Sequence, residues 1–219
     1  ERVSSFVYPG GILAVHAKGR GKDEIWTALK NKNVYGTSGP RILLWFDLIN
    51  SPEGQVPMGS EITMSQNPRF IVRAAGSFKQ KSGCSNESID SLSAKRLDYL
   101  CAGECYNPSN QREVIEKIEV IKITPQVYAG EAVSPLIQDP WKSIPCQGKG
   151  ECIVEFEDQD FSRDSVYYVR AIQSPTPAIN GSPLSQRDNF ELCKGSFRTD
   201  LEDDCLSMTN ERAWSSPIY

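Results

Sequence analysis

The segment Gly10–Ile42, GGILAVHAKGRGKDEIWTALKNKNVYGTSGPRI, limits most narrowly how this chain can fold. Residues 12–17 form an apolar run that is long enough for one buried strand and too short for a helix. An amphipathic helix is expected next, because acidic residues begin it, basic residues end it, and apolar residues recur between them at helical spacing. One strand and one helix cannot bury each other's apolar faces. Residues 1–40 are therefore expected to be the last strand and helix of an α/β domain whose earlier strands are missing from this chain.

The remaining residues, 41–219, are rich in short strand signals. Apolar and polar residues alternate at 113–124 and 165–173, and strand-forming residues recur at 41–49, 56–64, 69–78, 153–156 and 213–219. Only one short helix is expected among them, at 88–100. About seven strands separated by turn signals predict a mainly β fold, an antiparallel Ig-like β-sandwich. Two polar segments, 79–112 and 174–212, are expected to be irregular inserts that carry cysteines.

The cysteines lie in polar segments rich in Gly and Asn, and they are Cys84, Cys101, Cys105, Cys146, Cys152, Cys193 and Cys205. A zinc site needs close thiolate pairs with further Cys or His, and only Cys101 and Cys105 come near that spacing. Disulfide bonds in an oxidising compartment fit the pattern better. We expect Cys146–Cys152 and Cys193–Cys205, with Cys84 bonded to either Cys101 or Cys105. The odd thiol could pair with the missing N-terminal part.

Charge and hydropathy exclude some classes of partner. A net charge of −4 and a pI of about 5.2 give no electrostatic reason to expect nucleic acid. No apolar run approaches the roughly 20 residues that span a bilayer, so no transmembrane segment is expected. The chain starts at Glu1 without Met, which fits a processed or truncated product. With the cysteines, this predicts a periplasmic or secreted protein.

The segments GGILAVHAKGR and VYGTSGPRI, the helix between them and the final RAWSSPIY resemble the C-terminal part of the family filed as domain of unknown function 3604. The resemblance runs over nearly the whole chain, and it implies kinship with PHP-type metal-dependent phosphoesterases. That kinship implies a metal site built by HxH, acidic and SDTH-like motifs that lie upstream of this segment. None of these motifs occurs here, and the chain has one histidine, His16.

The resemblance therefore implies a C-terminal portion with no catalytic and no metal-binding residues of its own. Divalent metal ions are expected only in the full-length protein, whose N-terminal PHP-like domain is the expected partner. Whether the protein is an enzyme rests on that domain. The exposed face of the N-terminal helix could also pair with a second copy of the chain.

One candidate site for an anion follows the first strand. His16, Lys18 and Arg20 precede a helix N-terminus, where α/β folds collect anionic ligands, so they could line the rim of a phosphate or carboxylate pocket. A half-buried histidine and two solvated cations are the preferred alternative. The Gly36–Pro40 cluster lacks the lysine and the helix of a phosphate loop, so it is expected to be a turn.

A second hypothesis makes the chain a β-sandwich binding module without enzymatic activity. Trp45, Trp141 and Trp214 are then candidate contacts for a glycan or a protein, although each is more typical of a core or loop anchor. The acidic runs at 155–160 and 202–204 lack the spacing of an EF-hand and are expected to be solvated.

Overall fold

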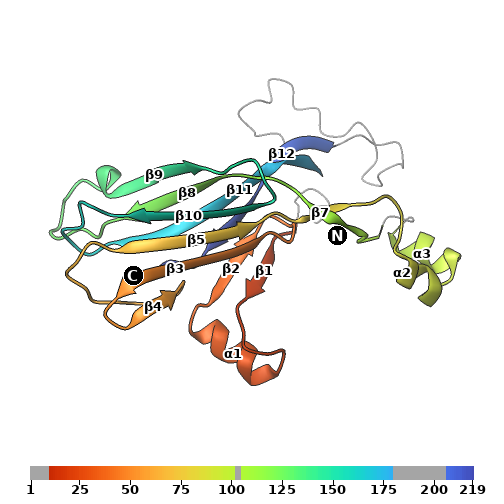
Figure 1. Cartoon of the computed structure of the whole chain (residues 1–219), viewed down its shortest axis with the longest axis horizontal. Coiled ribbons are helices and arrows are strands. Elements are labelled where there is room, and N and C mark those ends of the chain that lie inside the picture. The colour runs from red at the N-terminus through yellow and green to blue at the C-terminus, as the bar shows by residue number, and fades with distance from the viewer. Residues whose placement is uncertain (1–9, 102–104, 180–205) are drawn as a thin grey trace.

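The computed structural model describes residues 10–101, 105–179 and 206–219, and it shows two antiparallel sheets packed face to face (Figure 1). The buried core lies between the sheets and includes Phe46, Phe70 and Phe156, whose rings stack 5.0 to 6.4 Å apart. The predicted antiparallel β-sandwich is confirmed.

The larger sheet has six strands, in the order β1 (Ile12–Val15), β2 (Val34–Thr37), β12 (Leu206–Ser215), β11 (Val166–Ile179), β8 (Ile115–Ile123) and β9 (Ile137–Pro145). The alternation expected in β11 is present, because Tyr167, Val169 and Ala171 are buried while Tyr168 and Arg170 lie on the outer face. Side chains of period two thus place this strand's apolar face on the core.

The smaller sheet has four strands, in the order β10 (Glu151–Glu157), β5 (Arg69–Ala75), β3 (Leu43–Ser51) and β4 (Gly54–Pro57). The strand expected at 56–64 ends early, at Pro57. Gly59 follows with a φ of +91°, a backbone conformation that cannot continue a strand. The bond from Met58 N to Phe46 O then brings the chain back onto β3.

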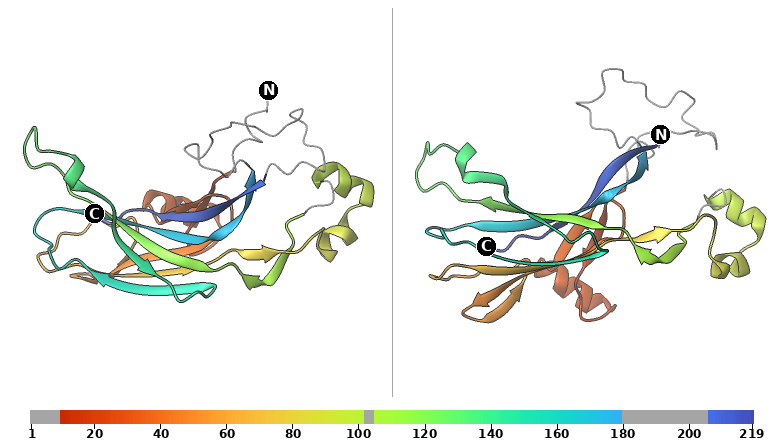
Figure 2. Two further views of the ribbon diagram at one scale, coloured as in Figure 1. Left: turned by 90° about the horizontal axis from the view of Figure 1, so that it is seen from above. Right: turned by 45° about the horizontal axis from the view of Figure 1, so that its top comes forward.

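The opening segment forms the expected strand and helix, with α1 at Lys22–Lys30. β2 was not expected, and it includes Gly36 and Thr37 of the cluster predicted to be a turn. However, β1 and β2 pair antiparallel, and β2 pairs with β12, so this segment extends the six-stranded sheet of the sandwich. The unit projects from one side of the sandwich in Figure 1 and in the right-hand view of Figure 2. Its assignment to a separate α/β domain stays a prediction.

The first insert leaves the sandwich through a ribbon of β6 (Phe78–Gln80) and β7 (Pro108–Arg112), and it carries α2 (Asn86–Ser91) and α3 (Ala94–Cys101). Both helices lie beyond the ribbon, away from the two sheets (Figures 1 and 2). The prediction of a single helix at 88–100 is wrong, because two helices lie there. Ser93 interrupts it, because its Oγ accepts a bond from Arg96 N at 3.3 Å and so caps a second helix.

The edge strand β9 was not expected, and a short 3-10 turn, Ser134–Leu136, precedes it. The closing strand expected at 213–219 begins earlier and ends at Ser215. A bridge between Ile218 and Tyr167 then holds the last residues against β11. The insert expected at 174–212 lies partly on β11 and β12, and residues 180–205 are outside the described chain.

Candidate functional site

β1 and α1 of the N-terminal unit carry several exposed apolar side chains. Leu13 of β1 is 59% exposed and Trp26 of α1 is 57% exposed. Three further apolar side chains are also exposed, Ile12, Ile25 and Leu29, while Ala28 alone among the residues of α1 is buried. We call these five exposed side chains the N-terminal apolar face. β1 pairs with β2 on one side only, so its other edge is unpaired within the described residues.

Several contacts fix this unit on the sandwich. His16 Nε2 lies 2.8 Å from the backbone oxygen of Leu44 in β3, and Asn33 Nδ2 donates to Met58 O at 2.9 Å. Gly59 packs against the end of α1 so closely that a Cβ there would lie 2.5 Å from Asn31 O. The N-terminal apolar face is therefore held in one orientation relative to both sheets.

The residues predicted to line an anion pocket, His16, Lys18 and Arg20, lie between β1 and α1. The His16 ring lies 5.3 Å from the Tyr35 ring and uses Nε2 for the bond to β3, which gives it a structural role in the core boundary. Lys18 and Arg20 are exposed. The Glu24 carboxylate folds back over Gly21, where a Cβ would meet Glu24 Oε2 at 2.2 Å. A carboxylate of the chain thus already lies beside the start of α1, and anion binding at this rim stays a prediction.

The residues present do not fit a resident metal centre. Within the described part of the chain, no group of three or more His, Cys, Asp or Glu side chains could hold a metal ion. From the first acidic run, Asp158 is fully buried and binds Lys122, so it is not solvated as expected. The second run, 202–204, lies outside the described residues.

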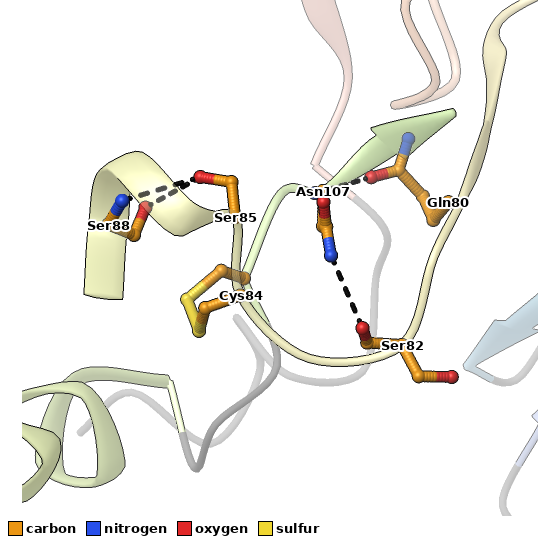
Figure 3. Close-up of a disulfide and its surroundings, with 7 residues drawn as sticks. Gln80, Ser82, Cys84, Ser85, Ser88 and Asn107 are labelled. Carbon is orange, nitrogen blue, oxygen red and sulfur yellow. Dashed lines mark hydrogen bonds between the residues drawn. A yellow bond between two sulfur atoms is a disulfide. The ribbon is translucent and has the colours of Figure 1, made fainter. Parts of the chain in front are cut away.

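Two disulfides are present among the described residues. Cys146–Cys152 joins the end of β9 to β10, as expected. Of the two pairings left open for Cys84, the structure has Cys84–Cys105. Figure 3 shows this bond at the base of the insert, where Asn107 N donates to Gln80 Oε1 at 3.0 Å. Cys101 ends α3, its side chain is not described, and Cys193 and Cys205 lie outside the described residues.

A buried polar cluster was missed from the sequence. Lys122 of β8 and the Tyr167 hydroxyl both donate to Asp158 Oδ2. Burial alone would raise the pKa of Asp158, but the bonds from Lys122 and Tyr167 outweigh it and hold that pKa below its ordinary value. Burial, and then the bond to Asp158, raises the pKa of Tyr167. Lys122 continues the inward positions of Ile118 and Val120, and a lysine at such a position signals a buried acidic partner.

The three tryptophans proposed as binding contacts are all half-buried. The Trp141 ring lies 6.0 Å from Tyr167 and 6.2 Å from Phe156, and the Trp45 ring lies 5.7 Å from His16. Trp214 lies in β12, opposite Gly36 of β2. The Trp45 and Trp141 rings thus pack against other rings of the sandwich.

Comparison with known proteins gives one match. The family described as "Protein of unknown function (DUF3604)" matches residues 2–82, which include β1, α1 and β2 as well as β3, β4 and β5. No curated protein and no solved structure matches the chain. The match is well short of half the chain, and its description names no activity.

Proposed function

We propose that this chain is the C-terminal, non-catalytic portion of a metal-dependent, phosphoesterase-like hydrolase, and that its N-terminal apolar face packs against a preceding α/β domain. The observation that carries the proposal is this face itself, which places Leu13 and Trp26 in water beside an unpaired strand edge. Exposed apolar groups next to an open edge favour association with another surface.

The match to the family of unknown function supports the proposal, because it begins upstream of β1 and includes the whole strand–helix–strand unit. The rigid attachment of α1 supports it as well, since a docking surface that is held in place loses little conformational entropy on association. The reaction class comes from the resemblance of residues 10–42 and 212–219 alone. Because the residues of this chain do not fit a metal site, no catalytic step is assigned to them.

Two disulfides indicate an oxidising compartment, since such bonds persist outside the cytosol. No helix among the described residues is long and apolar enough to cross a membrane. We propose that the protein works in the periplasm or outside the cell.

An activity assay tests whether this chain is non-catalytic by itself. A polypeptide from the same gene that begins upstream of Glu1, and this chain alone, would be assayed for hydrolysis of bis(p-nitrophenyl) phosphate with added Mn²⁺. We expect turnover by the longer polypeptide only. Turnover by this chain alone would contradict the non-catalytic assignment, and a gene that encodes no α/β domain before Glu1 would contradict the docking role.

A charged substitution tests whether the N-terminal apolar face packs against a preceding domain. Trp26→Glu should leave the unfolding free energy of this chain within about 0.5 kcal/mol of wild type, because the ring is exposed. In the longer polypeptide the same change should cost about 1.5 to 3 kcal/mol, the value of burying a large apolar side chain. Tyr128→Glu is the matched control, since Tyr128 is 64% exposed and lies in the β8–β9 connection.

Analytical ultracentrifugation of this chain tests whether a second copy of the chain, and not a preceding domain, covers the N-terminal apolar face. A dimer that Trp26→Glu abolishes and Tyr128→Glu leaves intact would show that the N-terminal apolar face pairs with a second copy. If that dimer also persisted in the longer polypeptide, the docking proposal would be wrong.

A further inference from the structure

A pocket of about 310 Å³ opens at one end of the sandwich, opposite the β6–β7 ribbon. We call it the end pocket. Its apolar wall comes from the end of β3, the start of β5 and the start of β11, through Leu48, Phe70 and Tyr167, together with Ile62 and Ile218. This volume falls within the range of about 300 to 1,000 Å³ that holds small ligands in proteins.

The end pocket is built from backbone that is already fixed. Ile62 N donates to Tyr219 O at 2.8 Å, and Tyr219 N donates to Ser60 O at 2.9 Å. Tyr167 and Ile218 exchange two further backbone bonds, at 3.0 and 2.8 Å. The loop after β4 and the last residues are thus tied to each other and to β11, so a ligand would enter a preformed space.

The lining combines aromatic rings with negative charge. Phe70, Phe161, Tyr167 and Tyr219 contribute rings, and the exposed acids Glu61 and Asp164 contribute carboxylates. Among the described residues that line the pocket, none is Lys or Arg. Aromatic faces and carboxylates both attract a cation, whereas the apolar wall favours a hydrocarbon body.

Three cations lie near the pocket, and each already contacts a group of the protein. Arg163 donates to both carboxylate oxygens of Glu131, at 2.9 and 3.1 Å, and to the carbonyl of Pro125. Lys122 is bound to Asp158, and its Nζ also lies 5.8 Å from the centre of the Tyr167 ring. Lys32 Nζ lies 4.6 Å from the centre of the Tyr219 ring, so this ring already faces a cation of the protein and is not counted as a contact for the ligand's charge. Tyr167 is 3% exposed and has its hydroxyl bound to Asp158, so that hydroxyl is not available to a ligand.

We propose that the end pocket binds a small organic cation with an apolar body, of the aryl-alkyl ammonium class. The ammonium group would lie near Glu61 and Asp164, and the apolar body would contact the half-buried side chains Ile62, Met64 and Phe161. This site is separate from the N-terminal apolar face, and its test does not depend on the proposed hydrolase.

Three probes of similar size and different charge test the proposal: benzyltrimethylammonium, benzyl alcohol and phenylacetate. Isothermal titration and ligand-observed NMR should show saturable binding of the cation with a Kd of about 0.1 to 1 mM. The neutral probe should bind about five- to thirty-fold more weakly, because it lacks the cation–π and carboxylate attraction. The anion should bind weakest of the three.

Variants then locate the site. The double change Glu61→Gln with Asp164→Asn should weaken the cation about three- to thirty-fold and leave the neutral probe unchanged, because only charge is removed. Glu53→Gln is the matched control, an exposed acid in the β3–β4 turn that lies outside the pocket. Phe161→Ala should weaken both the cation and the neutral probe.

Three results would overturn the proposal. The first is no saturation by the ammonium probe up to about 10 mM, well above the expected Kd. The second is equal affinity for the cation and the neutral probe. The third is a double variant that binds the cation as tightly as the Glu53→Gln control. Because both acids are exposed, circular dichroism should show that all these variants fold.

Discussion

The attachment of α1 to the sandwich can be tested at a single glycine. Gly59 and Gly54 have the same φ of +91°, which an L residue rarely adopts, so alanine suffers backbone strain at both positions, about 1 to 2 kcal/mol. At Gly54 a Cβ would meet nothing within 4 Å. At Gly59 it would meet Asn31 O at 2.5 Å and Lys32 O at 2.6 Å, and ordinary contact begins at 3.4 Å. The end of α1 must therefore move by nearly 1 Å, 3.4 minus 2.5, in Gly59→Ala.

Backbone shifts forced by an added methyl group typically cost about 1 to 3 kcal/mol. We therefore predict that Gly59→Ala lowers the free energy of unfolding by about 1 to 3 kcal/mol more than Gly54→Ala. Urea unfolding followed by tryptophan fluorescence measures this difference, and hydrogen exchange shows whether the amides of α1 lose protection. Equal losses in the two variants, with unchanged exchange in α1, would refute the view that this close approach fixes the helix.

Further predictions concern the buried cluster and the insert. Asp158→Asn should lower the free energy of unfolding by about 3 to 5 kcal/mol, because it leaves Lys122 buried without a counter-charge. The control Glu155→Gln breaks an exposed ion pair with Arg69 and should lower it by less than about 1 kcal/mol. Urea unfolding of both variants tests this, and equal costs would contradict it. The pKa of Asp158 in the folded state lies below its ordinary value. The ionised carboxylate therefore adds its full share to the free energy of unfolding above about pH 3.9, and this share is lost as pH falls through the folded-state pKa. Stability measured against pH should therefore fall less steeply on the acid side in Asp158→Asn than in wild type, and parallel curves would contradict the assignment. In Cys84→Ser, limited proteolysis should cut first within residues 81–107, since the lost disulfide closes the base of that insert. Cleavage within the two sheets at the same rate would contradict this prediction.

Local patterns predicted the strands that alternate. In β11, period-two alternation separated the buried face from the outer face correctly, because one side of the strand lies on the core. In β8 the alternation predicted the strand, but Ile115 and Ile121 are buried as well as Ile118 and Val120. In β9 the pattern failed. Its sequence, IQDPWKSIP, contains Pro140 and Pro145 and few strand formers, and only its position at the edge of a sheet tolerates those prolines.

Boundaries failed where one side chain or one dihedral angle decides them. Ser93 caps a new helix inside an apparently continuous pattern, and the positive φ of Gly59 ends the strand that the pattern would extend. Neither effect has a signature over a window of several residues. Local capping and turn chemistry outweighed periodicity at both positions.

The candidate sites depend on long-range contacts, which explains why sequence patterns found them only in part. The part of the N-terminal apolar face on α1, Ile25, Trp26 and Leu29, lies close together in sequence, and its helical spacing predicted it. The end pocket is lined by residues from Leu48 to Tyr219, and Lys122 meets Asp158 across 36 residues. No local pattern encodes such meetings, because they follow from the order of the strands.

The central claim is that another part of the same protein covers the N-terminal apolar face, and hydrogen exchange at β1 tests it most directly. In this chain, the β1 amides that are not bonded to β2 should exchange rapidly, since that edge is unpaired within the described residues. In a polypeptide that begins upstream of Glu1, the same amides should exchange at least about tenfold more slowly, because the preceding part covers them. Equally fast exchange in both, with the upstream part folded, would contradict it.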